Sequence, residues 1–514
     1  MPDAVPEFAV APRAVLSQRD IYRVLSGVLL GMFLSALDQS IVATALPAMG
    51  HALGGFRELS WIVSVYLLTS TASTPVYGRL SDLYGRRVML LIAIAIFITS
   101  STLCGFAQNM PQIIAARALQ GLGGGGLLSM AQSTIADIIS PRERGRYQAY
   151  FSGTYAIATV GGPVLGGIVV DHLSWSWVFW INPPLGILAF LLCRRALRLL
   201  PVPHVKREVD YLGAGLLMAT VGCWLFILSS GGKTLPWLSL DMAGVVVAGL
   251  VLTAALFWQE LRVAAPIVPP HLFRNHVVRQ AWFASLIITM AQLSMAVLMP
   301  SFLQLVLGVT PGQSGLLILP FMVGTVFGSF YAGGIMRRTG HYKRLALGAI
   351  CVTVLAQLLL AYEAEAMSLP MIEVGLLLTG LGFGPTFPAM MVSGQNGAEL
   401  KDLGIVTSMI AFFRTLGGSF GIAIMWALLL ATLAATLGAD HVHVLGSTVM
   451  NRVEGGSLPE ATRELLVPAL AHSFRLVFFG VAALSAAAAL VLASTREKPL
   501  RDESAYDLRQ RAAE

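Results

Sequence analysis

The sequence predicts an all-α integral membrane protein. Of its 514 residues, 56% are hydrophobic and 12% are charged, and the mean hydropathy is +0.74, whereas a soluble domain carries about 25% charged residues. Apolar runs of about 20 residues recur from end to end, and each could cross about 30 Å of hydrocarbon as a helix. The runs are continuous and do not alternate with polar residues, which argues against a transmembrane β-barrel.

Fourteen apolar stretches fit transmembrane helices. The first has an aspartate at its centre, which predicts a retained helix and not a cleaved signal peptide. They cover residues 22–46, 59–77, 88–107, 112–136, 148–170, 177–197, 209–230, 241–258, 280–307, 313–335, 345–362, 370–394, 404–431 and 473–494. The connection 432–472 is long, and its part 459–470 has helical apolar spacing. That part fits either an amphipathic cap or a solvated loop.

The basic residues set the expected orientation. With the N-terminus in the cytoplasm, 27 of the 34 Lys and Arg lie in cytoplasmic segments, and four lie opposite: Arg57, Lys233, Arg452 and Arg463. This asymmetry predicts that both termini are cytoplasmic and supports an even number of spans. The net charge of +7 therefore reflects short loops at the membrane surface, and we expect no nucleic-acid partner.

The connection after the second span reads GRLSDLYGRR, residues 78–87. Gly78 permits close helix approach and Gly85 permits a sharp turn. Asp82 can cap a helix start or pair with Arg86 and Arg87. This combination is more specific than a generic basic loop.

The same stretch resembles the loop 2–3 signature of the major facilitator superfamily. Four further stretches resemble that superfamily in the same order. LDQSIVATALP (37–47) is similar to the helix-1 signature of the fourteen-helix drug:proton antiporters, with Ser40 in a Thr position. ARALQGLGGG (116–125) resembles the helix-4 signature. GGPVLGG (161–167) resembles the antiporter signature of helix 5, with Ala158 replacing its first glycine, and WSWVFWINPPLG (175–186) resembles the start of helix 6, with Ser176 replacing an arginine.

The resemblance covers nearly the whole chain and implies a major facilitator fold of two six-helix bundles plus two inserted helices. The expected segments are a cytoplasmic N-terminal segment (1–21), an N-terminal bundle (22–197), an inserted helix pair with linkers (198–279), a C-terminal bundle (280–494, with the outer loop 432–472) and a cytoplasmic tail (495–514). Alternating access would rock these bundles about a cavity at the membrane midplane.

Asp38 and Arg117 are the candidate proton-coupling residues. Asp38 lies roughly 13 Å from the outer end of its helix at Pro47, and Arg117 lies roughly 9 Å from the same side. The family fold places these two helices beside one cavity, so the charges are expected to meet. They could form a fixed structural ion pair or a switch in which Asp38 takes a proton and releases Arg117.

Two glycine-rich stretches predict close helix packing. Gly162, Pro163, Gly166 and Gly167 bend a helix and remove side chains, which predicts a tight contact with helices of the other bundle. The GLGGGG run (121–126) lacks the Lys-Ser/Thr of a phosphate loop. Its GxxxG spacing predicts a close helix contact instead.

The second half offers weaker candidates. Arg414 lies deep in its span and could contact substrate, pair with Asp38 or bond to backbone carbonyls. Arg337 stands where a second copy of the loop signature would have its acid. Large, adaptable or polar side chains that could line a substrate cavity are Gln304, Asn182, Phe387 and Met391, although ordinary helix packing accounts equally well for each.

The sequence thus indicates a proton-coupled antiporter that exports amphipathic drugs or toxic compounds across the inner (plasma) membrane. The alternatives are a dedicated exporter of a lipid, siderophore or metabolite, and a membrane sensor or scaffold that transports nothing. The partners expected are a proton, a small amphipathic substrate and the lipid bilayer. We expect a functional monomer, which could also bind an accessory periplasmic partner. No nucleophile–base set, metal cluster or nucleotide loop is present in the sequence, so we expect neither an enzyme nor a cofactor.

Overall fold

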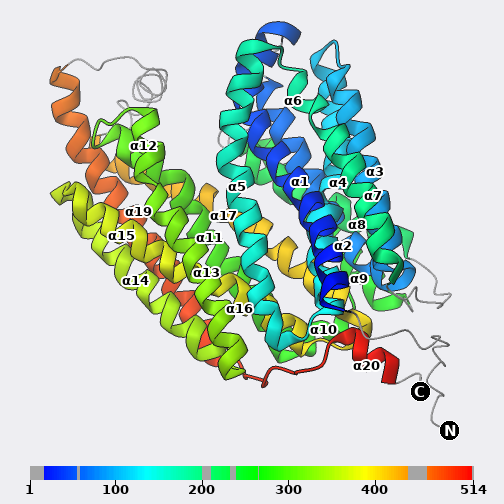
Figure 1. Cartoon of the computed structure of the whole chain (residues 1–514). Helices are drawn as coiled ribbons and strands as arrows, with labels where there is room; N and C mark the ends of the chain where they lie inside the picture. Colours follow the sequence, from blue (N-terminus) through cyan, green and yellow to red (C-terminus); the bar gives the residue numbers. More distant parts are fainter. Residues whose placement is uncertain are drawn as a thin grey trace. The chain divides into compact units, whose positions relative to one another are not determined.

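The computed structural model describes residues 17–54, 58–199, 210–231, 239–263, 266–437 and 460–511, which are almost entirely helical (Figure 1). The α-helices are α1 (Gln18–Leu53), α2 (Leu59–Tyr84), α3 (Arg86–Gly105), α4 (Met110–Ile138), α5 (Pro141–His172), α6 (Trp177–Trp180), α7 (Asn182–Ala196), α8 (Tyr211–Ser230), α9 (Leu240–Arg262), α10 (Pro270–Arg274), α11 (His276–Leu305), α12 (Pro311–Leu317), α13 (Leu319–Thr339), α14 (Lys343–Ala366), α15 (Leu369–Phe383), α16 (Thr386–Gly397), α17 (Leu403–Leu437), α19 (Glu460–Ser494) and α20 (Ala505–Arg511). Two short 3₁₀ turns are η2 (Leu197–Leu199) and η3 (Leu400–Asp402).

Eleven helical stretches among the described residues are long and apolar enough to cross a membrane. They coincide with eleven of the fourteen predicted spans. The other three ranges are helical as α2, α4 and α8. Polar Ser and Thr in α2 and glycines in α4 lower the hydropathy, and the apolar part of α8 is short, at Tyr211–Ile227. The count of fourteen therefore stays a prediction, and the all-helical membrane architecture is confirmed.

The chain divides into two compact units. Unit 1 consists of Met1–Arg279, Gly394–Phe412 and Lys498–Glu514, and unit 2 consists of Gln280–Ser393 and Phe413–Glu497. Helix α17 therefore begins in unit 1 and continues in unit 2. The C-terminal tail, although it follows the last helix of unit 2, belongs to unit 1.

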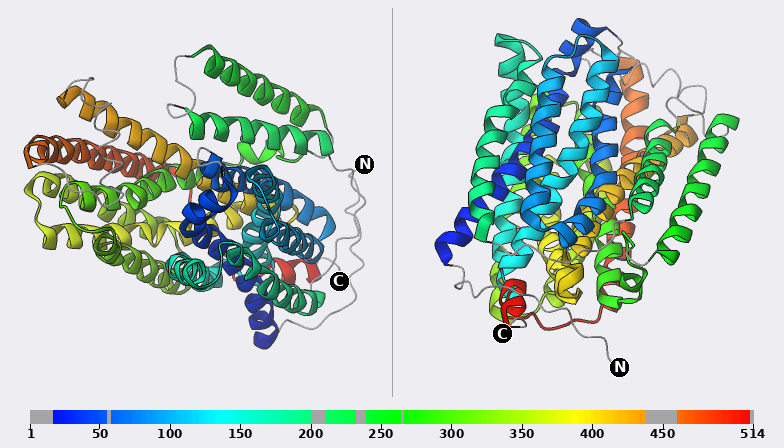
Figure 2. Two further views of the ribbon diagram at one scale, coloured as in Figure 1. Left: turned by 90° about the horizontal axis from the view of Figure 1, so that it is seen from above. Right: turned by 90° about the vertical axis from the view of Figure 1, so that its right-hand side faces the viewer.

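Glycines bring α4 into close contact with two neighbours in unit 1. Gly121 and Gly125 face α2, where a Cβ on Gly125 would overlap the carbonyl oxygen of Ser70. Gly123 faces α3, where an added Cβ would lie 2.8 Å from the carbonyl oxygen of Ala93. The predicted close contact at the GxxxG spacing is confirmed, and the helices of this unit run side by side (Figure 2).

The pair α8–α9 packs as an antiparallel hairpin, visible as two green helices lying side by side (Figure 2, left). The Trp224 indole N–H donates to the Thr253 hydroxyl at 3.0 Å, which ties α8 to α9. The rings of Trp61 and Phe226 stack with centroids 5.7 Å apart, which attaches α8 to α2.

Three predicted spans are interrupted, at α6–α7, α12–α13 and α15–α16. Pro183, Pro320 and Pro385 stand at these breaks, because proline lacks the N–H that would continue the helix. The last helix is longer than expected, since α19 begins at Glu460 and includes most of the predicted cap segment 459–470. Residues 438–459 of the predicted outer loop lie outside the described residues.

Candidate functional site

A carboxylate lies in the middle of α1 with no exposed surface. Asp38 is 0% exposed, and Leu34, Leu37 and Ile41 on the same side of the helix are also buried. This apolar helical spacing turns the α1 face that carries Asp38 into the core of unit 1. A charge in such a position needs partners, because its isolated burial would cost several kcal/mol.

Arg117 on α4 supplies the opposite charge. Its Nη1 donates to Asp38 Oδ2 at 2.5 Å, and its side chain is 1% exposed. Its Nε donates to the carbonyl oxygen of Ile62 at 3.2 Å, and its guanidinium lies 4.2 Å from the centroid of the Tyr66 ring. The expected meeting of the two charges is confirmed as a structural fact, whereas the proton-coupling role of the pair stays a prediction.

Two amides complete the surroundings of the Asp38 carboxylate. Gln120 Nε2 and Asn182 Nδ2 both donate to Oδ1, at 2.9 and 2.8 Å. The Gln120 amide oxygen accepts in turn from Arg117 Nη1 at 2.8 Å. Asp38 therefore accepts hydrogen bonds from residues of α4 and α7, and these satisfy both carboxylate oxygens.

A second layer of polar groups holds these partners in place. The Asn182 amide also donates to the Ser101 hydroxyl at 3.0 Å, and Ser101 donates to the carbonyl oxygen of Phe179 at 2.9 Å. The hydroxyls of Tyr66 and Ser35 lie 3.0 Å apart. The charged pair is thus enclosed in a polar network from α1, α2, α3, α4 and α7, which offsets the cost of burying it.

The direction of these hydrogen bonds limits what the site can do. All three partners of Asp38 donate hydrogen bonds to its carboxylate. If Asp38 took up a proton, the new O–H group would therefore face another hydrogen-bond donor on either oxygen. The Asn182 amide oxygen is buried and has no hydrogen-bond partner among the described residues. If the Asn182 amide turned over, that oxygen could accept a hydrogen from a protonated Asp38.

A second charged cluster lies at the end of α2. This helix continues through Gly78 and Asp82 to Tyr84, so these residues are helical and do not lie in a loop as predicted. Asp82 Oδ1 contacts Arg86 Nη2 at 2.6 Å. Its two oxygens also accept from the backbone N–H groups of Gly404 and Ile405, at 3.0 and 2.9 Å. Asp82 therefore both pairs with an arginine and caps the start of α17, the two roles that its position allows.

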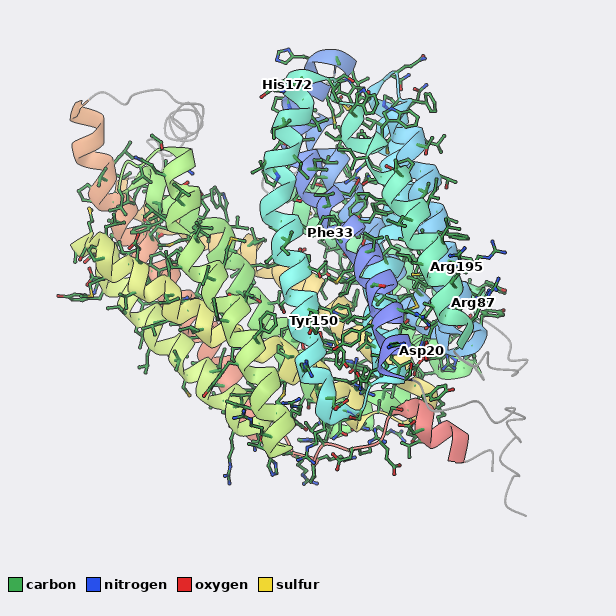
Figure 3. All side chains as sticks on the ribbon, in the orientation of Figure 1. Asp20, Phe33, Arg87, Tyr150, His172 and Arg195 are labelled. Atoms are coloured by element: carbon green, nitrogen blue, oxygen red, sulfur yellow. The ribbon has the colours of Figure 1, made fainter. Side chains whose placement is uncertain are left out.

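The neighbouring residues of the loop signature have distinct places. Gly85 has φ 89° and joins α2 to α3, which confirms the predicted turn. Arg86 also donates to Asp137 Oδ2 at 2.8 Å. A Cβ on Gly78 would overlap the side chain of Ser408, so α17 approaches closely here. Arg87 lies with Asp20 and Arg195 toward one end of unit 1, and His172 lies toward the other end (Figure 3).

Two glycines of α5 pack on α1 of the same unit, and the expected contact of α5 with the other bundle stays a prediction. A Cβ on Gly162 would overlap Ser40, and one on Gly166 would overlap Thr44, both on α1 of the same unit. Nothing lies within 4 Å of an added Cβ on Gly167, and Pro163 is exposed. The Ser40 hydroxyl donates across this contact to the carbonyl oxygen of Ala158 at 2.8 Å, so the missing side chains admit α1.

Comparison with known proteins identifies the family. The family model described as Major Facilitator Superfamily matches residues 28–422, most of the chain. The chain belongs to the major facilitator superfamily. It is therefore a membrane transporter protein of the all-helical major facilitator fold, and the transporters of this superfamily are not enzymes.

Several relatives within the superfamily are named as transporters. The chain is 33% identical over 401 residues to multidrug resistance protein 3 of Bacillus subtilis, covering 78% of each chain. It is 32% identical over 486 residues to an uncharacterized MFS-type transporter of Mycobacterium tuberculosis, covering 93% of this chain and 70% of the other. The solved structure of the proton:xylose symporter XylE matches with a TM-score of 0.61 at 12% identity, covering 96% of this chain and all of that one, and supports the fold alone.

In this transporter, the other predicted cavity residues do not form one group, and each has different neighbours. Arg414 stacks on Phe387 with 3.8 Å between the guanidinium carbon and the ring centroid. Met391 is fully buried one turn beyond Phe387 on α16. Gln304 donates to the Ser314 hydroxyl at 2.8 Å and fixes the α11–α12 turn. Asn182 joins the Asp38 network, and its role in lining a cavity stays a prediction.

Gln120, Tyr66 and Asp137 are site residues that the sequence reasoning missed. Gln120 follows Arg117 by three positions, which places both on one face of α4, so helical spacing could have revealed it. Tyr66 and Asp137 carry no comparable signal, because their contacts depend on how α2, α3 and α4 pack.

Proposed function

We propose that this transporter is a proton-coupled antiporter that exports amphipathic drugs or toxic compounds by alternating access. The observation that carries the proposal is the enclosed Asp38–Arg117 pair, with Gln120 and Asn182 also bonded to the carboxylate. Acidic side chains within membrane helices are costly and commonly mark proton pathways. The multidrug and efflux names of relatives support drugs as the substrate class.

Within the superfamily, we assign the chain to the fourteen-helix drug:proton antiporters. The helix-1 and helix-5 stretches support this assignment, as do α2, α4 and α8 beside the eleven apolar spans. The distribution of Lys and Arg supports an inner-membrane protein with both termini in the cytoplasm. We also propose that the transporter functions as a monomer.

In the proposed cycle, protonation of Asp38 and substrate binding disfavour each other. A proton entering from outside converts Asp38 to the neutral acid and weakens its attraction for Arg117, and substrate binding from inside promotes release of that proton. One proton supplies about 1.4 kcal/mol per pH unit and about 2.3 kcal/mol per 100 mV of membrane potential. The exchange of one proton can therefore drive a substantial concentration gradient.

Transport in proteoliposomes tests the proposal. With an imposed pH gradient, we expect uphill accumulation of chemically diverse amphipathic dyes, each accompanied by a proton flux and abolished by a protonophore. A response to one lipid, siderophore or metabolite alone would favour a dedicated exporter. If no compound produced a proton-coupled flux, the antiport proposal would fail and a sensor or scaffold would be favoured.

Asn182→Ala is expected to reduce uphill transport by roughly 5- to 150-fold, because the loss of one buried hydrogen-bond partner costs about 1–3 kcal/mol. The variant removes both the donor to Asp38 and the amide oxygen available to its protonated form. Transport and proton flux would be measured in the same vesicles.

Gln357→Ala is the matched control for Asn182→Ala. Gln357 is a buried amide bonded to Thr379 in unit 2 and does not contact Asp38. It should keep near-normal coupling. Equal losses in the two variants would show a general packing effect and remove Asn182 from the proton site.

A further inference from the structure

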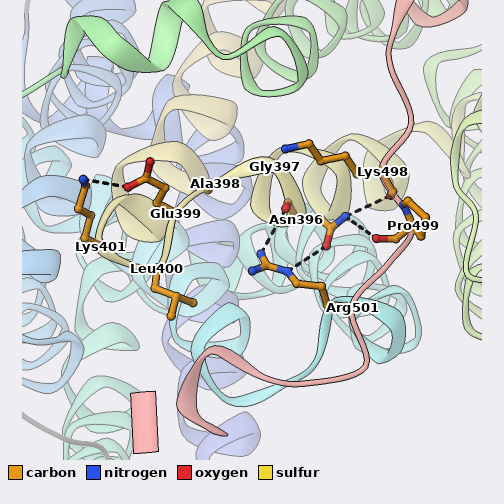
Figure 4. Close-up of a pocket in the computed structure, with 9 residues that line it drawn as sticks. All are labelled: Asn396, Gly397, Ala398, Glu399, Leu400, Lys401, Lys498, Pro499 and Arg501. Atoms are coloured by element: carbon orange, nitrogen blue, oxygen red, sulfur yellow. Dashed lines mark hydrogen bonds and ion pairs between the residues drawn. The ribbon is translucent and has the colours of Figure 1, made fainter. Parts of the chain in front are cut away.

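A cavity of about 620 Å³ lies where the C-terminal tail crosses the segment that leads into α17 (Figure 4). Its walls include Asn396, Glu399 and Lys401 from that segment and Lys498, Pro499 and Arg501 from the tail. Both segments belong to unit 1. The cavity is largely open to solvent, and its volume falls within the range of about 300–1,000 Å³ that is typical of small-ligand sites.

Hydrogen bonds fix the tail wall of this cavity. The Asn396 side-chain amide donates to the carbonyl oxygens of Lys498 and Pro499, at 3.2 and 3.1 Å. Arg501 donates from Nε to Asn396 Oδ1 at 3.4 Å and from Nη2 to the Asn396 carbonyl oxygen at 3.2 Å. Further along the tail, Tyr506 is buried in the core of unit 1. The cavity is therefore built by ordered contacts.

The lining carries an excess of positive charge, with three cationic side chains against one carboxylate. That carboxylate, Glu399, pairs with Lys401 at 2.8 Å. Among the described residues, Arg501 donates its hydrogen bonds to the uncharged oxygens of Asn396, and partial burial lowers the pKa of Arg501 below its usual range. Arg501 is exposed at this wall, so its guanidinium can form charge-assisted hydrogen bonds to an anion that enters the cavity.

A fourth cation strengthens this field. Arg144 is almost fully buried and interacts electrostatically with Arg501. Its guanidinium donates to the carbonyl oxygens of Ile139 and Ala136 and to the side-chain oxygen of Gln395 at 3.3 Å. These acceptors are uncharged, but the carboxylate of Asp137 also attracts Arg144 and offsets part of its charge, so Arg144 adds only part of a positive charge behind the cavity wall.

We propose that this cavity binds a phosphate-bearing anion, held by Arg501 and Lys498. Arginine and lysine together recognise phosphate through charge-assisted hydrogen bonds. Along the chain, Lys498 follows Ser494, the last residue of an apolar span, by four residues, and phospholipid headgroups lie at the ends of such spans. The phosphate could therefore come from an anionic lipid or from a soluble phosphate compound, and its binding would hold the tail against the start of α17.

A thermal-shift titration of the purified full chain in detergent tests this proposal. The probes are dioctanoyl phosphatidylglycerol, inorganic phosphate and zwitterionic dioctanoyl phosphatidylcholine. Phosphatidylglycerol or inorganic phosphate should raise the unfolding midpoint. The half-saturating concentration should rise at least about tenfold in Arg501→Ala and in Lys498→Gln, since one charge-assisted hydrogen bond contributes about 1.5–3 kcal/mol.

Arg195→Ala is the matched control, because Arg195 is an exposed arginine at the end of α7, outside the cavity. It should leave the half-saturating concentration unchanged.

A response to phosphatidylglycerol alone assigns the site to a lipid headgroup, and a response to inorganic phosphate assigns it to a soluble phosphate. An equal response to phosphatidylcholine, no response to either anion, or unchanged titrations in both cavity variants would overturn the proposal. Lys498→Gln keeps the backbone carbonyl that binds Asn396, so the tail can stay in place.

Discussion

Asp38→Asn is expected to abolish uphill, proton-driven transport in proteoliposomes while leaving downhill substrate exchange measurable. The amide has nearly the same shape and keeps an oxygen that can accept from Arg117, but it cannot take up and release a proton. Removing one partner of a buried ion pair costs about 3–5 kcal/mol in general. We expect Asn to lose less, because it still provides a hydrogen-bond acceptor.

Folding and charge effects are separated by two companion variants. Asp241→Asn removes an acid from the exposed first turn of α9 and should transport normally. Asp38→Asn/Arg117→Gln removes both charges and should recover stability without recovering uphill transport. If Asp38→Asn supported normal coupled efflux, Asp38 would not be the proton site.

Asp82→Ala is expected to lower both the transport rate, by more than about tenfold, and the unfolding temperature. The substitution breaks a buried ion pair with Arg86, which costs about 3–5 kcal/mol. It also leaves the first N–H groups of α17 without their cap, which typically costs about 1 kcal/mol. Transport assays and thermal unfolding of the purified variant measure the two effects.

Asp502→Ala provides the control for Asp82→Ala. The Asp502 side chain is 71% exposed and pairs with Arg142 at 2.9 Å, and an exposed pair contributes only about 0–1 kcal/mol. Asp82→Asn should fall between wild type and alanine, because one side-chain oxygen can still accept a backbone hydrogen bond. A full transport rate in Asp82→Ala would argue that its cap on α17 has no part in the transport cycle.

Hydropathy was sufficient to locate the eleven most apolar helical stretches, because a span needs a predominantly apolar run of about 20 residues. It did not predict the breaks at Pro183, Pro320 and Pro385, since proline can either bend a helix or end it. It also did not predict that residues 394–412 and the C-terminal tail pack with unit 1. Such long-range contacts depend on tertiary packing and leave no periodic signal.

The Asp38–Arg117 contact was predictable because topology and helical rise give two charges a similar depth. The participation of Gln120 and Asn182 was not predicted, because it depends on the rotation of α4 and α7 about their axes. The same limit applies to α5. Its glycines indicated a close neighbour correctly, but composition alone could not distinguish α1 from a helix of the other bundle.

Proton release on substrate binding tests the central claim most directly. A transported dye would be added to the purified transporter in weakly buffered detergent solution at a series of starting pH values, and the pH change would be recorded at each. We predict release of about one proton per transporter in wild type, as expected for one coupling acid, and no release in Asp38→Asn at saturating dye. Undiminished proton release from Asp38→Asn would contradict the assignment of Asp38 as the coupling site.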